Sequence, residues 1–428
     1  MTDELRPVAP ADGALSVRGG VGGIRFQWEE LEEAARVLAL LAADTGDVAV
    51  ALGYLDRDVA EFPWRVMHLQ PLGGVACAQY QQALAYLDRA WTSTVRDGRT
   101  LASTEERLRA ALRTYRLADA AALAVTEATR AAGGAAARAA ARGAIDGGAL
   151  DVGPIGLRVR TAGAPVRFDG TVEGMLDRLS AVEGEDPGTF EVLRAGTDED
   201  PVYVVVLPGT QSGHIGGTGS NPFDIGGIAE ALAEDSRFTE AVVLEALEQA
   251  GAREGDALVL AGYSQGGLHA VNLAGSQRLG GRYEVQLVLT AGSPTGWHGT
   301  GRSEYLHLEH RDDAVPELDS TPNEDDRHRT TVRLDNPVPP LARRDDGSQE
   351  PVGLGPAHKL ENYAEGARLI DASSAPSLAP SVGLLATAGA TGTARRYSFT
   401  ATRGPRPAPV PEVRRRRGAP GGGSRLWP

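Results

Sequence analysis

A serine between two glycines is the residue of this chain best suited to covalent chemistry. Ser264 lies in Gly262-Tyr-Ser-Gln-Gly266, after an apolar run that predicts a buried strand over 257–261. A predicted helix opens at Gly267, and a Gly-x-Ser-x-Gly turn between strand and helix exposes the serine hydroxyl. The glycines avoid collisions with the neighbouring strand and helix. We therefore predict that Ser264 is a nucleophile; the alternative is a serine in an ordinary strand-to-helix turn.

A serine hydroxyl needs a base that removes its proton, and the base needs an acid that orients it. Asp312 and Asp313 directly follow a predicted strand over 305–309. A carboxylate at the carboxyl end of that strand can face the same edge of the sheet as the serine at the end of 257–261. On this ground either aspartate could be the acid, and the alternative is a pair of surface loop acids.

Two histidines follow these aspartates in the chain. His358 precedes a predicted helix over 360–370 near the end of the domain, which is where we expect the base. His328 lies in a charged loop and is expected to be exposed to solvent. Of the earlier histidines, His269 is expected to pack on the helix after the serine, and His214 lies in a glycine-rich loop that could line the substrate pocket.

Ester chemistry also requires N–H donors for the negative charge that develops on the substrate carbonyl oxygen. One predicted donor is the backbone N–H of Gln265, the residue after the nucleophile. The second is expected from the loop Leu207-Pro-Gly-Thr-Gln211, where Thr210 or Gln211 could supply it, and Gln211 could also line the pocket. This loop has neither a G-x-G-x-x-G pattern nor a P-loop lysine, so it does not match a phosphate-binding site.

Residues from about 150 to 372 show the pattern of an α/β domain. Apolar or alternating runs predict strands over 202–207, 257–261, 285–290 and 305–309. A helical pattern over 239–250 lies between the first two strands. Helices that alternate with buried strands indicate a mostly parallel sheet flanked by helices.

Residues 21–147 show helical spacing and predict an antiparallel all-α domain. Gly46 is expected to end its first helix. Ser103-x-x-Glu106 has the spacing of a capping box and is expected to begin the third helix, which Gly133-Gly134 would interrupt.

The segments outside these two domains have different composition. Gly147-Gly148 marks the boundary between the domains, so we expect a fragment of about 150–375 to fold by itself. Residues 1–20 are expected to form a flexible arm. Residues 373–428 are rich in Ala, Pro and Gly and are expected to form a disordered tail.

Composition excludes several classes of function. The net charge of the 428 residues is −14, which argues against a nucleic-acid binder, because phosphates require a cationic face. Cys77 is the single cysteine, so neither an intramolecular disulfide nor a multi-cysteine zinc site can form, and no metal or cofactor is expected. The first ten residues lack the apolar region of a secretory signal. No run of about 18 apolar residues is present, so no membrane-spanning helix is expected.

Four segments together resemble serine α/β-hydrolases of the cutinase and class 3 lipase type, including related actinobacterial hydrolases. They are the Gly262–Gly266 elbow, an oxyanion loop Pro208-Gly-Thr210 with proline in place of arginine, an acid motif Asp313-Ala-Val-Pro316, and a histidine segment His358–Tyr363. The resemblance covers about 200–370 and implies an α/β-hydrolase fold with Asp313, not Asp312, as the acid. The cutinase disulfides are absent, so polyester activity does not follow.

The helical domain resembles, more faintly, the WXG-type hairpins of type VII secretion substrates. Tyr115-Arg-Leu-Ala-Asp119 fits their Tyr-x-x-x-Asp/Glu export motif, but no Trp-x-Gly turn is present. Tyr115 can equally be a plain helix-face residue. The resemblance implies export by a type VII-like route and contact between the helical domain and a protein partner, whereas a cytoplasmic location is expected otherwise.

These observations predict a serine hydrolase that cleaves small acyl esters or lipids through an acyl-enzyme. His358 would take the proton of Ser264, Asp313 would orient the imidazole, and Gln265 and Thr210 would bind the oxyanion. One alternative is a binding module whose helical domain engages a partner while the catalytic fold is idle. The other is an acyltransferase that uses an acceptor other than water.

Overall fold

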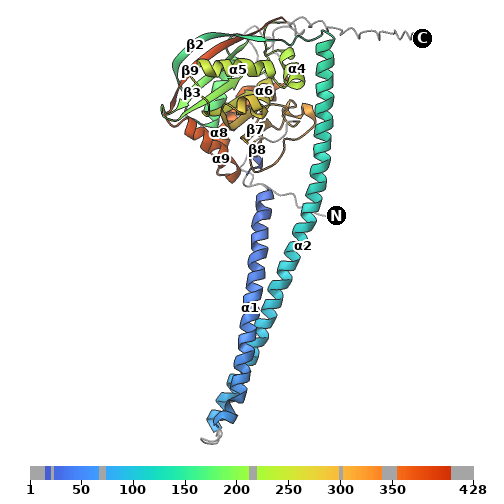
Figure 1. Cartoon of the computed structure of the whole chain (residues 1–428), viewed down its shortest axis with the longest axis vertical. Coiled ribbons are helices and arrows are strands. Elements are labelled where there is room, and N and C mark those ends of the chain that lie inside the picture. Colours follow the sequence, from blue (N-terminus) through green and yellow to red (C-terminus); the bar gives the residue numbers. More distant parts are fainter. Residues whose placement is uncertain are drawn as a thin grey trace, which may run out of the picture.

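The protein consists of a long helical hairpin joined to a body built around one sheet (Figure 1). The computed structural model describes residues 15–20, 24–66, 74–211, 219–297, 302–339 and 354–405. The α-helices are α1 Ile24–Val66, α2 Gly74–Asp146, α3 Val172–Glu183, α4 Ile225–Glu234, α5 Arg237–Gln249, α6 Gln265–Gly275, α7 Gln277–Gly280, α8 Leu360–Asp371 and α9 Ala379–Ala388. Short 3-10 helices cover Pro316–Asp319 (η1), Pro356–His358 (η2) and Pro376–Leu378 (η3).

The nine described strands form one sheet in the order β1-β8-β7-β6-β5-β4-β3-β9-β2. Their bounds are β1 Leu15–Gly19, β2 Ile155–Arg167, β3 Thr189–Gly196, β4 Pro201–Leu207, β5 Ala257–Tyr263, β6 Glu284–Ala291, β7 Glu304–His310, β8 Arg329–Leu334 and β9 Thr393–Arg403. Strands β4 to β8 pair in parallel, and the remaining pairs are antiparallel. The sheet is therefore mixed, with the predicted parallel strands at its centre.

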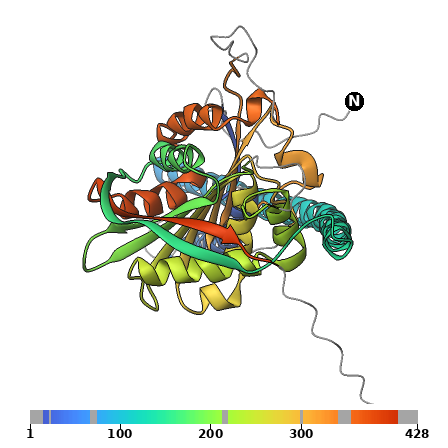
Figure 2. The ribbon, with the colours of Figure 1, turned by 90° about the horizontal axis from the view of Figure 1, so that it is seen from above.

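Helices cover both faces of this sheet (Figure 2). Apolar residues of α3, α8 and α9 pack on one face, and those of α5, α6 and α7 pack on the other. Val204, Val259 and Leu289 belong to the first cluster, whereas Val205, Leu260 and Val288 belong to the second. Successive strand residues point to opposite faces, which is why the central strands are continuous apolar runs. The α/β class predicted from these runs is confirmed.

Two strands lie in segments that were expected to be unstructured. β9 lies between β3 and β2, so residues 393–403 are an internal part of the sheet and not a tail, and α9 also lies in that segment. β1 pairs with β8 and forms one edge of the sheet, so residues 15–19 are not a loose arm. The composition of β9 hid it, because Thr393–Arg403 carries three arginines and three threonines and few large apolar residues. The arginine run at 414–417 lies outside the described residues.

The hairpin helices are longer than the sequence analysis predicted, and three predicted interruptions are wrong. Gly46 lies inside α1, which continues to Val66. Ser103 does not cap a helix, since its hydroxyl donates to the Thr100 carbonyl oxygen one turn earlier (3.0 Å) within α2. Gly133 is also inside α2, where a Cβ would lie 2.7 Å from the indole nitrogen of Trp297. The glycine therefore serves close packing against the body and does not break the helix.

The second half of α2 is attached to the body by polar and apolar contacts. Arg130, only 8% exposed, donates from Nε to the carbonyl oxygen of Gly296 (2.5 Å) and from Nη2 to that of Pro322 (3.3 Å). Nearer the end of α2, Ala141 and Ile145 pack against residues of α4. The hairpin and the body thus share a buried interface across the predicted boundary at Gly147-Gly148.

Helix α1 and the first half of α2 project away from the body (Figure 1). Both expose large apolar side chains, such as Leu40, Trp64 and Trp91. Among the described residues, the segment Leu31–Arg65 is long and apolar enough to cross a membrane. Its most apolar stretch of 18 residues has a mean hydropathy of 1.5, and 6% of that stretch is buried. This differs from the expectation that no such segment exists. The same segment contains ten Asp, Glu and Arg residues, and a charged side chain at a bilayer centre costs about 3 kcal/mol. Length and composition alone do not place it in a membrane.

Deleting the strands at the ends of the chain is expected to prevent folding. A fragment of residues 150–375 lacks β1, β9 and the interface with α2, so on this topology we expect that it does not fold alone. Loss of β9 also removes Arg403, whose guanidinium pairs with the buried Asp224 carboxylate (Nη2–Oδ1 2.6 Å). Breaking a buried ion pair alone costs about 3–5 kcal/mol.

Circular dichroism during heating measures this expectation. A matched fragment of residues 15–405, which retains all described elements, should unfold cooperatively near the temperature of the full chain. The 150–375 fragment should be insoluble or show no cooperative transition. A soluble 150–375 fragment with a native-like transition would contradict the account of the sheet.

Candidate active site

Ser264 occupies a strained turn between β5 and α6. Its backbone has φ 52° and ψ −117°, outside the regions that most residues adopt. Its N–H donates to the carbonyl oxygen of Ala291 at the end of β6 (2.8 Å). A Cβ on Gly262 would lie 2.2 Å from the Gly266 carbonyl, and a Cβ on Gly266 would lie 2.4 Å from the Leu207 oxygen. Any side chain at Gly262 or Gly266 would therefore collide with the backbone, so this turn requires glycine at both positions.

A line of hydrogen-bonding distances runs from the serine through a histidine to an aspartate. His358 Nε2 lies 3.0 Å from Ser264 Oγ, and His358 Nδ1 lies 2.7 Å from Asp313 Oδ2. All three side chains are buried, with 4% of Ser264, 6% of His358 and 3% of Asp313 exposed. The serine follows β5, the aspartate follows β7, and the histidine ends η2 just before α8. An imidazole so placed can accept a proton from the hydroxyl while the carboxylate stabilises the imidazolium.

The carboxylate of Asp313 is held in a fixed orientation. The Tyr363 hydroxyl donates to Oδ2 (2.5 Å), and the Val315 N–H donates to Oδ1 (2.9 Å). Burial and the neighbouring negative charge of Asp313 raise the pKa of Tyr363, so its hydroxyl keeps the proton that it donates. Asp312 is exposed, and the structure brings only Asp313 to the histidine.

Tyr263 and Gly292 shape the surroundings of the histidine ring. The Tyr263 ring stacks on the His358 imidazole, with centroids 5.1 Å apart and planes at 26°, and its hydroxyl donates to the His358 carbonyl oxygen (2.5 Å). Burial raises the pKa of Tyr263 and keeps it a donor. Gly292 has φ +59°, and a Cβ there would lie 3.1 Å from His358 Cε1 and 3.2 Å from Asp313 Oδ2. The sequence analysis assigned a role to neither residue, although Tyr263 lies within the elbow motif.

The remaining candidate histidines have other surroundings. His269 is fully buried with Nδ1 2.8 Å from Ser236 Oγ, and burial, followed by the charge of Arg403, lowers its pKa to about 3. It is therefore a neutral packed residue. His328 Nδ1 lies 2.6 Å from Glu304 Oε1, at the start of β7 and near the surface. His214 lies outside the described residues.

The loop after β4 lies beside the turn that carries Ser264. Thr210 contacts Gln265, whereas Gln211 bonds to other parts of the body. With the Gln265 amide nitrogen oriented toward the loop, it donates to Thr210 Oγ1 (3.2 Å) and to the Asp224 carbonyl oxygen (3.1 Å). The Thr210 hydroxyl proton then remains for another acceptor. The Gln265 N–H is the first of α6, and helices leave their first N–H groups without intrahelical partners.

Gln211 uses its backbone N–H and its side-chain oxygen in hydrogen bonds within the protein, so the N–H predicted as a possible oxyanion donor already has an acceptor. Its backbone N–H donates to the Phe223 carbonyl oxygen (2.8 Å), and its side-chain oxygen accepts from the Gly188 N–H (2.7 Å) and from Asn221 (3.2 Å). Gln211 therefore stabilises the loop after β4 through these hydrogen bonds. Thr210 is the loop residue that contacts Gln265.

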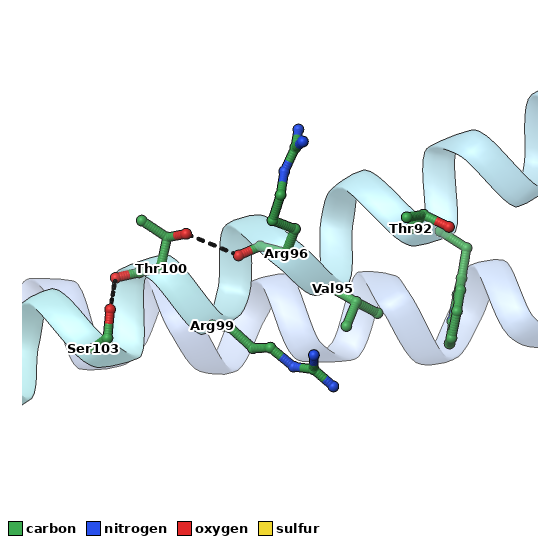
Figure 3. A pocket seen from close by; sticks show the side chains of 7 residues that line it. Thr92, Val95, Arg96, Arg99, Thr100 and Ser103 are labelled. Carbon is green, nitrogen blue, oxygen red and sulfur yellow. Dashed lines mark hydrogen bonds between the residues drawn. The ribbon is translucent and has the colours of Figure 1, made fainter.

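A surface hollow of about 540 Å³ lies elsewhere, on the hairpin (Figure 3). Its lining residues belong to α2 and are Trp91, Thr92, Val95, Arg96, Arg99, Thr100 and Ser103. Ser103 precedes Arg130, where α2 meets the body, by 27 residues, or roughly 40 Å of helix. The hollow is therefore separate from the Ser264 site. Among the described residues no group of three or more His, Cys, Asp and Glu side chains could hold a metal ion.

The site therefore combines a buried Ser264–His358–Asp313 arrangement, two glycines that shape the turn, and the pair Gln265 and Thr210. Comparison with known proteins finds no match to a family model, a curated protein or a solved structure.

Proposed function

We propose that this protein is a serine hydrolase that cleaves carboxylic esters, with Ser264 as nucleophile, His358 as general base and Asp313 as the orienting acid. The observation that carries the proposal is the continuous Oγ–Nε2 and Nδ1–Oδ2 line, with distances of 3.0 and 2.7 Å, between three buried side chains. Three elements far apart in the chain supply them, and each is fixed by further hydrogen bonds. Such convergence on one hydroxyl suits an activated nucleophile.

The reaction follows from this geometry in two stages. As Ser264 Oγ attacks the ester carbonyl carbon, His358 Nε2 takes the hydroxyl proton, and the carbonyl oxygen becomes an oxyanion. The Gln265 N–H and the Thr210 N–H or hydroxyl would donate to that oxygen. The C–O bond to the alcohol then breaks, and His358 returns the proton to the departing alcohol. Water, deprotonated by His358, then attacks the acyl carbon, and the bond to Ser264 Oγ breaks as His358 returns the proton to that oxygen and the carboxylic acid leaves.

The order of the elements supports an α/β-hydrolase of the cutinase and class 3 lipase type. The nucleophile follows a central parallel strand, the acid follows the strand two positions along the sheet, and the histidine precedes a late helix. This is the chain order Ser, Asp, His of such hydrolases. Pro208 in place of arginine and the single Cys77 are departures that leave the substrate open among small esters and lipids.

The test is hydrolysis of p-nitrophenyl esters with acyl chains of two to sixteen carbons by the purified full-length protein. We expect release of p-nitrophenol with at least one chain length. Addition of a primary alcohol separates hydrolysis from acyl transfer, since a transferase would form the new ester in preference to the free acid. Absence of turnover on every chain length would contradict the proposal.

A second candidate function concerns the hairpin, for which we propose association with a second copy of the chain. Leu41, Val48, Leu55 and Phe62 recur at every seventh residue of α1 and are between 46% and 52% exposed. A seven-residue repeat of apolar residues is covered best by another helix running alongside. A symmetric antiparallel contact would set Val48 of one copy near Leu55 of the other.

Sedimentation velocity over a range of concentrations tests this association. The wild type should form dimers, and Val48→Glu with Leu55→Glu should leave monomers with unchanged esterase activity. Val50→Glu is the matched control, because Val50 is 59% exposed but lies off the repeat. A wild type that remains monomeric at every concentration would exclude the association.

A further inference from the structure

A carboxylate outside the Ser264–His358–Asp313 arrangement contacts the loop beside it. Glu183 is the last residue of α3, and its Oε1 accepts a hydrogen bond from the backbone N–H of Gly209. Gly209 directly precedes Thr210 in the loop after β4. A charged acceptor makes one of the stronger hydrogen bonds to a backbone N–H. Glu183 therefore fixes the peptide that leads into the predicted oxyanion donor.

The same carboxylate lies close to the ring that stacks on the histidine. A Cβ built on Gly209 would lie 2.8 Å from Tyr263 Cδ1 on one side and 3.1 Å from Glu183 Oε1 on another. The carboxylate and the Tyr263 ring therefore both adjoin Gly209, and that ring stacks on His358 with centroids 5.1 Å apart. Only a residue without a side chain fits at Gly209 unless its neighbours shift.

We propose that Glu183 is a positioning residue of this site, which holds the Gly209–Thr210 peptide in place and stabilises the imidazolium that forms on His358 during the reaction. The proposal rests on the proposed esterase function. The Glu183 side chain has two properties that can be changed separately. Its oxygen accepts the hydrogen bond that holds the Gly209–Thr210 peptide, and its negative charge stabilises the imidazolium.

The titratable groups around this position set the sign of the charge effect. The charge of Glu183 acts on Tyr263 and on His358. His358 also bonds to Asp313, which accepts from the Tyr363 hydroxyl. Burial raises the pKa of the Glu183 carboxyl, while the Gly209 N–H and the His358 charge oppose that rise. An ionised carboxylate favours the imidazolium, so its removal makes the neutral, reactive imidazole persist to lower pH.

Two substitutions separate these properties. Glu183→Gln keeps an oxygen that can accept from the Gly209 N–H but removes the charge. We expect its kcat to stay within about threefold of wild type, with the acid limb of the kcat/KM profile displaced to lower pH by about half a unit. Glu183→Ala removes both properties, and we expect kcat to fall about tenfold or more with KM within about twofold, because loss of one oxyanion-hole donor costs about 10²–10³.

Glu173→Gln is the matched control. Glu173 lies at the start of the same helix, and its carboxylate accepts from Arg368 Nε at the surface (2.6 Å). If Glu183→Ala fails to show a cooperative thermal transition, the pH profile of Glu183→Gln decides the question alone. An active wild type with Glu183 variants that match Glu173→Gln, or with an unmoved acid limb in Glu183→Gln, would overturn the inference. An inactive wild type would instead overturn the proposed function, so the two failures are distinguishable.

Discussion

Ser264→Ala is expected to abolish ester hydrolysis in a protein that remains folded. The substitution removes the Oγ atom that lies 3.0 Å from His358 Nε2, and no acyl-enzyme can then form. Loss of the nucleophile from a comparable triad lowers kcat by about 10⁶. We therefore expect p-nitrophenyl butyrate turnover at the level of the uncatalysed reaction or slightly above it.

Ser381→Ala is the matched control for this measurement. Ser381 lies in α9 and is 1% exposed, so the control removes an equally buried hydroxyl outside the site. Its activity should equal that of the wild type. Hydrolysis that persists in purified Ser264→Ala with an unchanged thermal transition would mean that the nucleophile lies elsewhere.

Asp313→Asn is expected to lower kcat by about 10⁴, the loss that follows when the acid of a serine triad is replaced by its amide. Asp313 Oδ2 accepts from His358 Nδ1 at 2.7 Å and from the Tyr363 hydroxyl. An amide nitrogen in that position would donate to Nδ1 and favour the tautomer that places the proton on Nε2, facing the serine. That tautomer cannot accept the Ser264 proton.

The neighbouring aspartate supplies the control. The Asp312 side chain is exposed, and it is Asp313 that bonds to His358, so Asp312→Asn should change kcat by less than about threefold, as for an ordinary surface substitution. Steady-state kinetics on one short ester compare the two variants. Small and equal losses in both would show that the acid is another residue.

The elements that position the site were predictable where local sequence determines them. Apolar runs identified the central strands, because a strand buried on both faces must be apolar throughout. The elbow was predictable from its glycines, since steric exclusion at Gly262 and Gly266 leaves few alternatives. The preference for Asp313 over Asp312 needed a resemblance to a known motif, and the structure supplies the physical reason in the hydrogen bonds of Tyr363 and Val315.

The features that were missed depend on contacts between distant parts of the chain. β9 is polar and arginine-rich, and its place between β3 and β2 follows from pairing with residues about two hundred positions earlier. The predicted breaks in the hairpin used valid local signals, but the packing of Gly133 against Trp297 overrides one of them. Glu183 lies 26 residues before Gly209 and belongs to no motif, so its contact with the loop could not be read from the sequence.

The central claim is that Ser264 is an activated nucleophile, and labelling with a fluorophosphonate probe followed by peptide mapping tests it most directly. The account predicts one modified site, on the peptide that contains Ser264, with no labelling of Ser264→Ala and much slower labelling of Asp313→Asn. The folded protein must react, since the activation depends on His358 lying 3.0 Å from the hydroxyl. A folded wild type that does not react, or that is modified on a different residue, would contradict the account.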